Sequence, residues 1–207
     1  MTSGVDAFVH VWQPSARADT PVLLMLHGTG GNERELLPLA FELMPSAAVL
    51  SPRGQVLENG MPRFFRRIAE GVFDEVDLRR RATELAEFVS AAKAEYVFEG
   101  RPVVAVGYSN GANVAGAILL LKPGTLDRAV LLRAMVPLVL DPPPDLRDAS
   151  ILISNGRVDP LVAVEQTERL ARLFQKTGAA VELRWQRAGH GLVEGDVIAA
   201  KTFLAAL

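Results

Sequence analysis

The segment Gly107-Tyr108-Ser109-Asn110-Gly111 decides the fold of this chain. The apolar run Pro102 to Val106 precedes it and the small-residue stretch Ala112 to Leu121 follows it, which predicts a strand, a tight turn and a helix. Side chains two residues before and after a serine at the apex of such a turn would clash, so both positions need glycine. The free N–H groups of the helix favour negative charge beside the serine. The segment therefore predicts a nucleophile that makes an oxyanion, and the alternative is a glycine-rich connection with a capping serine.

The composition fits a domain with a sheet that is buried on both faces. Of the 207 residues, 49% are hydrophobic. No apolar run reaches the roughly 20 residues that span a bilayer, so we expect no insertion into a membrane. The length fits a single domain over residues 1–207. The formal net charge of −2 gives no electrostatic reason to bind nucleic acid.

Cysteine is absent from the chain, which excludes disulfides, cysteine zinc sites and a cysteine nucleophile. The first residues, Met1 to Asp6, lack the basic and apolar regions of a signal peptide. The sequence therefore predicts a cytoplasmic protein, and we expect no metal in its site.

Short apolar runs alternate with helical patterns along the chain. The expected strands are Ala7–Trp12, Val22–Leu26, Ala48–Ser51, Val103–Val106, Ala129–Leu132, Ile151–Ser154 and Val181–Gln186. The expected helices are Glu33–Met44, Glu75–Tyr96, Ala112–Leu121, Leu161–Thr177 and Asp196–Leu207. This alternation predicts an α/β fold, with a mainly parallel sheet and helices on both faces. A ligand site in such a sheet lies beyond the carboxyl ends of the strands.

Two later loops offer partners for Ser109. An activated serine needs a base within hydrogen-bond reach and an acid that orients the base. His190 stands between two glycines beyond the last expected strand, so its imidazole can reach over the sheet. Asp159 follows another expected strand and precedes Pro160. The chain order Ser109, Asp159, His190 is that of α/β-hydrolase folds, and the alternative for either partner is a capping role.

An oxyanion needs two N–H donors beside the serine. We expect one from the backbone of Asn110 and the second from Thr29, in the glycine-rich loop that begins at His27. His27 itself is expected to hold this loop. Tyr108 and Asn110 flank the serine, and the side chain of one of them should line the substrate pocket.

The chain resembles the α/β-hydrolase superfamily, and within it the compact phospholipase/carboxylesterase family that includes acyl-protein thioesterases. The resemblance covers nearly the whole length and rests on segments 27–31, 51–54, 107–111, 156–160 and 189–191. The stretch Pro62 to Arg67 is similar to a bacterial subset of carboxylesterases and hydroquinone-linked hydrolases. Membership implies ester or thioester hydrolysis without a cofactor, and a homodimer is common in this group. The chain differs from acyl-protein thioesterases at Asn32, where they usually carry an acidic residue, and it has no insertion for a large lid.

Residues Arg53 to Phe73 are the expected specificity segment, because they join a core strand to the long helix and are rich in Phe and Arg. The candidates are Phe64, Phe65 and Phe73 for the wall of an acyl pocket, and Arg53 or Arg66 for pairing with a substrate carboxylate. The alternative is that the phenylalanines anchor the core and the arginines face solvent.

The sequence therefore predicts a serine esterase that cleaves small carboxylic esters through an acyl-enzyme. Two alternatives stay open. One is an acyl thioesterase or lysophospholipase that acts on long chains. The other is a non-catalytic protein that keeps the fold as a ligand pocket.

Overall fold

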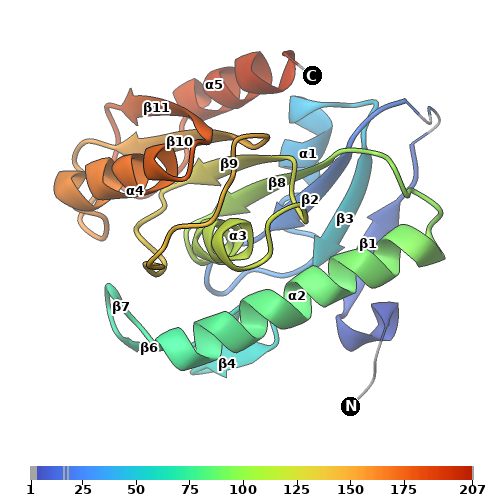
Figure 1. Cartoon of the computed structure of the whole chain (residues 1–207), viewed down its shortest axis with the longest axis horizontal. Coiled ribbons are helices and arrows are strands. Elements are labelled where there is room, and N and C mark those ends of the chain that lie inside the picture. Colours follow the sequence, from blue (N-terminus) through green and yellow to red (C-terminus); the bar gives the residue numbers. More distant parts are fainter. Residues whose placement is uncertain (1–3, 16, 18, 207) are drawn as a thin grey trace.

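A seven-stranded sheet forms the centre of the molecule (Figure 1), in a computed structural model that describes residues 4–15, 17 and 19–206. The strand order is β1-β3-β2-β8-β9-β10-β11. The strands are β1 (His10–Gln13), β2 (Val22–Leu26), β3 (Ala48–Pro52), β8 (Val103–Tyr108), β9 (Arg128–Leu132), β10 (Ser150–Gly156) and β11 (Ala180–Gln186). β1 pairs antiparallel with β3, and the other neighbouring pairs are parallel. The carboxyl ends of the six parallel strands therefore meet at one edge.

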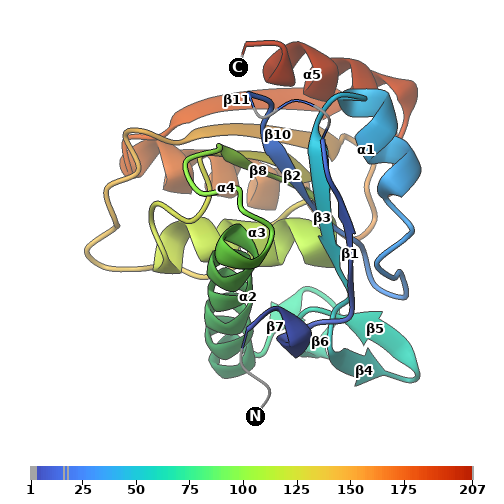
Figure 2. The ribbon, with the colours of Figure 1, turned by 90° about the vertical axis from the view of Figure 1, so that its right-hand side faces the viewer.

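Helices cover both faces of this sheet (Figure 2). They are the short 3-10 helix η1 (Val5–Ala7) and the α-helices α1 (Leu37–Leu43), α2 (Glu75–Glu95), α3 (Asn110–Leu121), α4 (Val164–Lys176) and α5 (Glu194–Leu204). α2, α3 and α4 pack on one face, and α1 and α5 pack on the other. The architecture is thus the predicted three-layer α/β fold.

Burial on both faces explains why the strands read as continuous apolar runs. All five residues of β2 are buried, with Leu24 in the core beneath α2 and α3 and Leu23 in the core beneath α1 and α5. Burying one such leucine contributes about 1.5–3 kcal/mol. On α2 one stripe of apolar residues is buried, at Leu78, Ala82, Leu85, Val89 and Ala92.

The sequence predicted the seven strands of this sheet and the five α-helices, but several ends differ. α1 begins at Leu37 instead of Glu33, because Pro38 has no N–H to donate and fits only the first turn of a helix. α4 begins at Val164, three residues after the expected start at Leu161. α5 ends at Leu204, and Leu207, the last residue of the expected helix, lies outside the described residues.

The segment between β3 and α2 forms four short strands that the sequence analysis did not predict. They pair as two hairpins, β4 (Val56–Glu58) with β5 (Met61–Arg63) and β6 (Arg67–Ala69) with β7 (Val72–Phe73). Strands of two or three residues are too short for an alternating pattern to emerge. We call residues 53–74 the arm. It lies apart from the central sheet, beside α2 (Figure 2).

The backbone of the turn at Ser109 is strained. Ser109 has φ +52° and ψ −112°, a conformation that L-residues rarely adopt. A Cβ on Gly111 would lie 2.0 Å from the backbone oxygen of Leu26, and one on Gly107 would lie 2.6 Å from Cα of Ala112. Both glycines are therefore required by the close approach of the turn to β2 and α3.

Replacing Gly111 by alanine is expected to lower the free energy of unfolding by about 3 kcal/mol, because the added Cβ overlaps the backbone at the end of β2. Gly116→Ala on the same helix is the matched control, since its Cβ would lie 3.4 Å from Cγ of Pro137. Alanine there gains about 0.5–1 kcal/mol of helix preference over glycine. Urea unfolding followed by circular dichroism measures both variants. Equal stability of the two would contradict the steric argument.

Candidate active site

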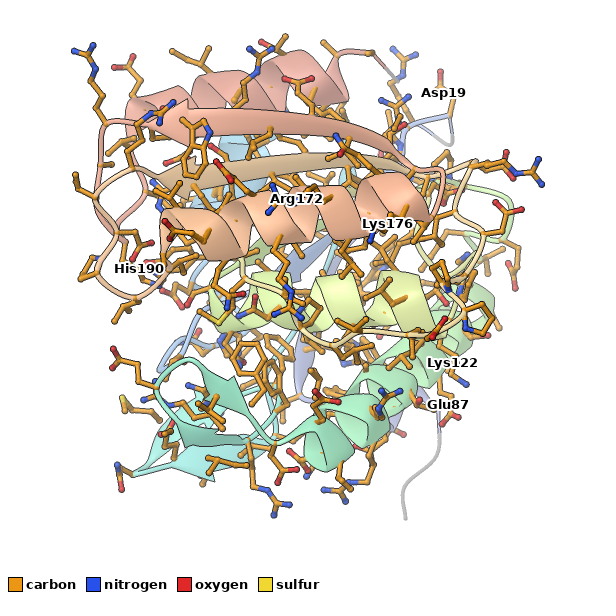
Figure 3. All side chains as sticks on the ribbon, turned by 60° about the vertical axis from the view of Figure 1, so that its left-hand side comes forward. Asp19, Glu87, Lys122, Arg172, Lys176 and His190 are labelled. Atoms are coloured by element: carbon orange, nitrogen blue, oxygen red, sulfur yellow. The ribbon has the colours of Figure 1, made fainter. Side chains whose placement is uncertain are left out.

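Three side chains from the loops after β8, β10 and β11 meet at the carboxyl edge of the sheet, where Figure 3 labels His190. His190 Nε2 lies 2.9 Å from Oγ of Ser109, and His190 Nδ1 lies 2.8 Å from Oδ2 of Asp159. A carboxylate only accepts hydrogen bonds, so in the neutral imidazole Nδ1 carries the proton and donates it to Asp159. The hydroxyl of Ser109 then donates to Nε2. The structure thus brings together the three residues that the sequence selected.

Asp159 is held by the turn that contains it. Its Oδ1 accepts hydrogen bonds from the N–H groups of Leu161, at 2.8 Å, and Val162, at 3.2 Å. Since α4 begins only at Val164, the carboxylate caps this turn and not the helix. Oδ2 is left for His190, so the capping role and the orienting role coexist in one side chain.

Thr29 and Asn110 both line the cavity beside Ser109. Within the described part of the chain, the backbone N–H of neither residue donates a hydrogen bond. By contrast, the N–H of Ser109 donates to the carbonyl of Leu132 at 2.8 Å. Two N–H donors at the edge of a cavity suit a developing negative charge.

The loop that carries Thr29 is held by His27, as predicted. His27 Nδ1 donates to the carbonyl of Gly28 at 2.6 Å, and its Nε2 accepts from the N–H of Gly54 at 3.0 Å. This pattern requires the neutral imidazole, and burial lowers the pKa of His27, which favours the same form. The loop and the start of the arm are therefore joined through one side chain.

A buried arginine that the sequence analysis missed holds the loop of His190. The side chain of Arg133 is fully buried and makes two hydrogen bonds, of 2.8 and 2.6 Å, to the carboxylate of Asp196. Its remaining N–H groups donate to the carbonyls of Gly189, Gly191 and Ser154. The residues on both sides of His190 are thereby fixed to the sheet. The only signal in the sequence was a charged residue directly after an apolar strand.

A cavity of about 320 Å³ opens beside the serine. It is lined by Thr29, Tyr108, Ser109, Asn110 and His190, by Arg63, Arg67, Glu70, Gly71 and Phe73 of the arm, and by Asn113, Arg133, Met135, Leu161 and Val162. Its volume is at the small end of ligand pockets, which suits a small molecule. Tyr108 lines it as expected, and its hydroxyl donates to the carbonyl of His190 at 3.1 Å.

Two of the three phenylalanines proposed for the acyl wall do not line this cavity. Phe64 and Phe65 are buried in the core on the α2 and α3 face. The N–H of Phe64 donates to Oδ1 of Asn110 at 2.7 Å, which ties the arm to α3. The alternative, that they are core anchors, is therefore correct, and only Phe73 of the three candidates reaches the cavity.

The two arginines proposed to bind a carboxylate do not line this cavity either. Arg53 makes two hydrogen bonds, of 2.5 and 2.8 Å, to Glu33. Arg66 pairs with Asp74 at 3.1 Å and keeps an exposed side chain. The hairpins of the arm turn Arg63 and Arg67 toward the cavity instead. The sequence does not show how the hairpins orient their side chains, so it could not distinguish the arginines that face the cavity from those that do not.

The described residues contain no group of three or more His, Cys, Asp or Glu side chains that could hold a metal ion. In the same part of the chain, no helix combines the length and the apolar character that crossing a membrane requires.

A mainly parallel sheet of this order, with a serine at a strained strand-to-helix turn, is an α/β-hydrolase fold. No family model matches the chain. It is 46% identical over 175 residues to "Putative hydrolase MhqD" of Bacillus subtilis (strain 168), a match that covers 84% of this chain and 88% of that protein.

Two solved structures are similar over almost the full length. A Bacillus cereus carboxylesterase is 46% identical with a TM-score of 0.94, covering 96% of this chain and 94% of its own. The structure of YahD with malic acid is 29% identical with a TM-score of 0.90, covering 96% and 98%. The chain therefore belongs to the carboxylesterase family of α/β hydrolases and is a hydrolase of the esterase class.

Replacing Asp196 by asparagine is expected to lower the free energy of unfolding by about 3–5 kcal/mol, because it leaves the buried charge of Arg133 without its partner. Asp145→Asn is the matched control, since its pair with Arg147 is exposed and should contribute less than about 1 kcal/mol. Urea unfolding of the two variants checks this. A loss for Asp196→Asn as small as that of the control would show that the pair does not hold the loop.

Proposed function

We propose that this protein cleaves small carboxylic esters through an acyl-enzyme, with Ser109 as the nucleophile. The observation that carries the proposal is the pair of hydrogen bonds from His190, 2.9 Å to Ser109 and 2.8 Å to Asp159. They join a nucleophile, a base and an orienting acid in the arrangement that serine hydrolases require. The relation to carboxylesterases supports the same class of reaction.

The chemistry follows from these three positions. Ser109 Oγ attacks the ester carbonyl while His190 Nε2 takes the hydroxyl proton. Asp159 keeps the imidazole in the tautomer that accepts this proton and stabilises the imidazolium without becoming protonated. His190 then protonates the leaving alcohol, and an acyl group remains on Ser109. Water, activated by the same imidazole, releases the acid.

The negative charge on the carbonyl oxygen needs donors that are in place before the reaction. We assign this role to the backbone N–H groups of Thr29 and Asn110, which have no acceptor within the described residues. Gly28 supports the placement of these donors beside the serine. Because Gly28 has no side chain, the ring of Tyr108 can pack against the loop that carries Thr29. A Cβ there would lie 2.8 Å from that ring.

Two observations support a small substrate. The cavity of about 320 Å³ is bounded by the arm on one side and the His190 loop on the other. YahD, 29% identical, was solved with malic acid, a small polar molecule. Cytoplasmic location and a homodimer stay predictions from the sequence.

Ser109→Ala is expected to lower kcat/KM for 4-nitrophenyl butanoate by about 10⁴-fold or more, because the variant has no nucleophile. A fluorophosphonate probe should label the wild-type protein and leave the variant unlabelled. Ser46→Ala is the matched control, since Ser46 is exposed and remote from the cavity. If Ser109→Ala hydrolysed 4-nitrophenyl butanoate at the wild-type rate, the proposed mechanism would be wrong.

Acyl-chain length tests the size of the substrate. Because the cavity is small, kcat/KM for 4-nitrophenyl esters should be highest between acetate and butanoate and about tenfold lower for decanoate. Release of nitrophenolate gives the rates. A maximum at decanoate or longer would contradict this proposal and favour the thioesterase or lysophospholipase alternative.

A further inference from the structure

We propose that the preferred ester carries a carboxylate on its acyl part, and that Arg63 and Arg67 of the arm bind this carboxylate. The inference rests on the proposed esterase function and names the class of its substrate. It differs from the sequence-based expectation, which placed this role on Arg53 or Arg66. Both of those residues have their guanidinium groups paired outside the cavity.

Arg63 presents a desolvated positive charge to the cavity. Its side chain is only 4% exposed, yet it lines the space beside Ser109. Nε donates to the carbonyl of Phe65 at 3.1 Å and Nη1 donates to Oγ1 of Thr29 at 2.7 Å. Within the described part of the chain, Nη2 donates no hydrogen bond. A buried guanidinium with unused donors gains strongly from a carboxylate, which accepts two parallel N–H bonds.

Arg67 adds a second guanidinium that is only partly neutralised. Its Nε donates to Oε1 of Glu58 at 2.9 Å, and Glu58 Oε2 lies 3.1 Å from Nη1 of Arg63. The two arginines therefore share one carboxylate, which leaves the trio with one net positive charge. Both Nη groups of Arg67 are without an acceptor among the described residues.

The other charges around the cavity do not supply a competing cation. Arg133 also lines it, but all of its N–H groups are used by Asp196 and three carbonyls. Glu70 opposes the arginines, although it is exposed at the turn between β6 and β7, where solvent weakens its field. Among the described residues, the buried Nδ2 group of Asn110 has no partner, and Asn110 lines the same space, so it offers a further donor to an anionic substrate.

The position of the arm assigns the carboxylate to the acyl part. The leaving oxygen must face His190 Nε2 to receive a proton, so the alcohol lies toward the His190 loop. Figure 3 shows this loop on one side of α3 and the arm on the other. Arg63 also binds Thr29, which lies on the oxyanion side of the serine. A short acyl chain that ends in a carboxylate can therefore reach the arginines while its carbonyl lies beside Ser109.

Two esters that differ only in the charged group test the proposal. Ethyl hydrogen succinate carries a carboxylate where ethyl butanoate has a methyl group, and release of ethanol measures kcat/KM for each. We expect the wild-type protein to prefer the succinate ester by about tenfold or more. Its carboxylate would accept charge-assisted hydrogen bonds from the arginines, whereas the methyl group of ethyl butanoate accepts none. Arg67→Gln should reduce this preference by about tenfold, and Arg67→Lys should restore part of it.

Arg66→Gln is the matched control, because it removes the neighbouring arginine, which pairs with Asp74 outside the cavity. Its preference for the succinate ester should equal that of the wild-type protein. A wild-type preference at or below one, or equal losses in Arg66→Gln and Arg67→Gln, would overturn the carboxylate site. In that case hydrolysis of ethyl butanoate that Ser109→Ala abolishes would leave the esterase function standing. If neither ester nor 4-nitrophenyl butanoate is cleaved, both proposals fail.

Acetoxyacetate, which carries its carboxylate on the alcohol part, tests the orientation against ethyl acetate. We expect no preference for acetoxyacetate. A preference for it that exceeds the preference for ethyl hydrogen succinate would overturn the assignment to the acyl part.

Discussion

The close approach of the Ser109 turn to β2 is the constraint on which the site depends. At Gly111 there is no room for a Cβ beside the carbonyl of Leu26, and Ser109 has a left-handed φ of +52°. This geometry lifts the serine hydroxyl out of the sheet and aims the first N–H groups of α3 at the same point. The buried sheet on either side provides the rigidity that keeps such a conformation in place.

A second constraint fixes His190 in relation to that serine. Two carbonyls of the His190 loop, those of Gly189 and Gly191, accept hydrogen bonds from the buried guanidinium of Arg133. Asp196, at the start of α5, balances the charge and also accepts a hydrogen bond of 2.7 Å from Ser154 on β10. A fully satisfied network of this kind specifies one arrangement, because each unmade bond would leave a buried charge or carbonyl without a partner.

The arm contributes one side of the cavity. It is joined to the carboxyl edge of the sheet by a few polar contacts, from Gly54 to His27, from Phe64 to Asn110 and from Arg63 to Thr29. Its hairpins place the cationic side chains of Arg63 and Arg67 beside the serine. In α/β enzymes the sheet usually positions the reacting residues, and a local segment faces the substrate.

The sequence by itself determined the elements of the sheet, the serine turn and the order of Ser109, Asp159 and His190. These features are local, since apolar periodicity, glycine spacing and loop position can be recognised without knowing what lies across the sheet. Only the tertiary structure decided which of the clustered arginines face the cavity. Arg53, Arg63, Arg66 and Arg67 are the same residue type within one short segment. Whether Arg63 and Arg67 face the cavity depends on the register of their hairpins, which short strands do not encode in their sequence. The partnership of Arg133 with Asp196 was equally hidden, because it joins residues far apart in the chain whose pairing exists only once the sheet has formed.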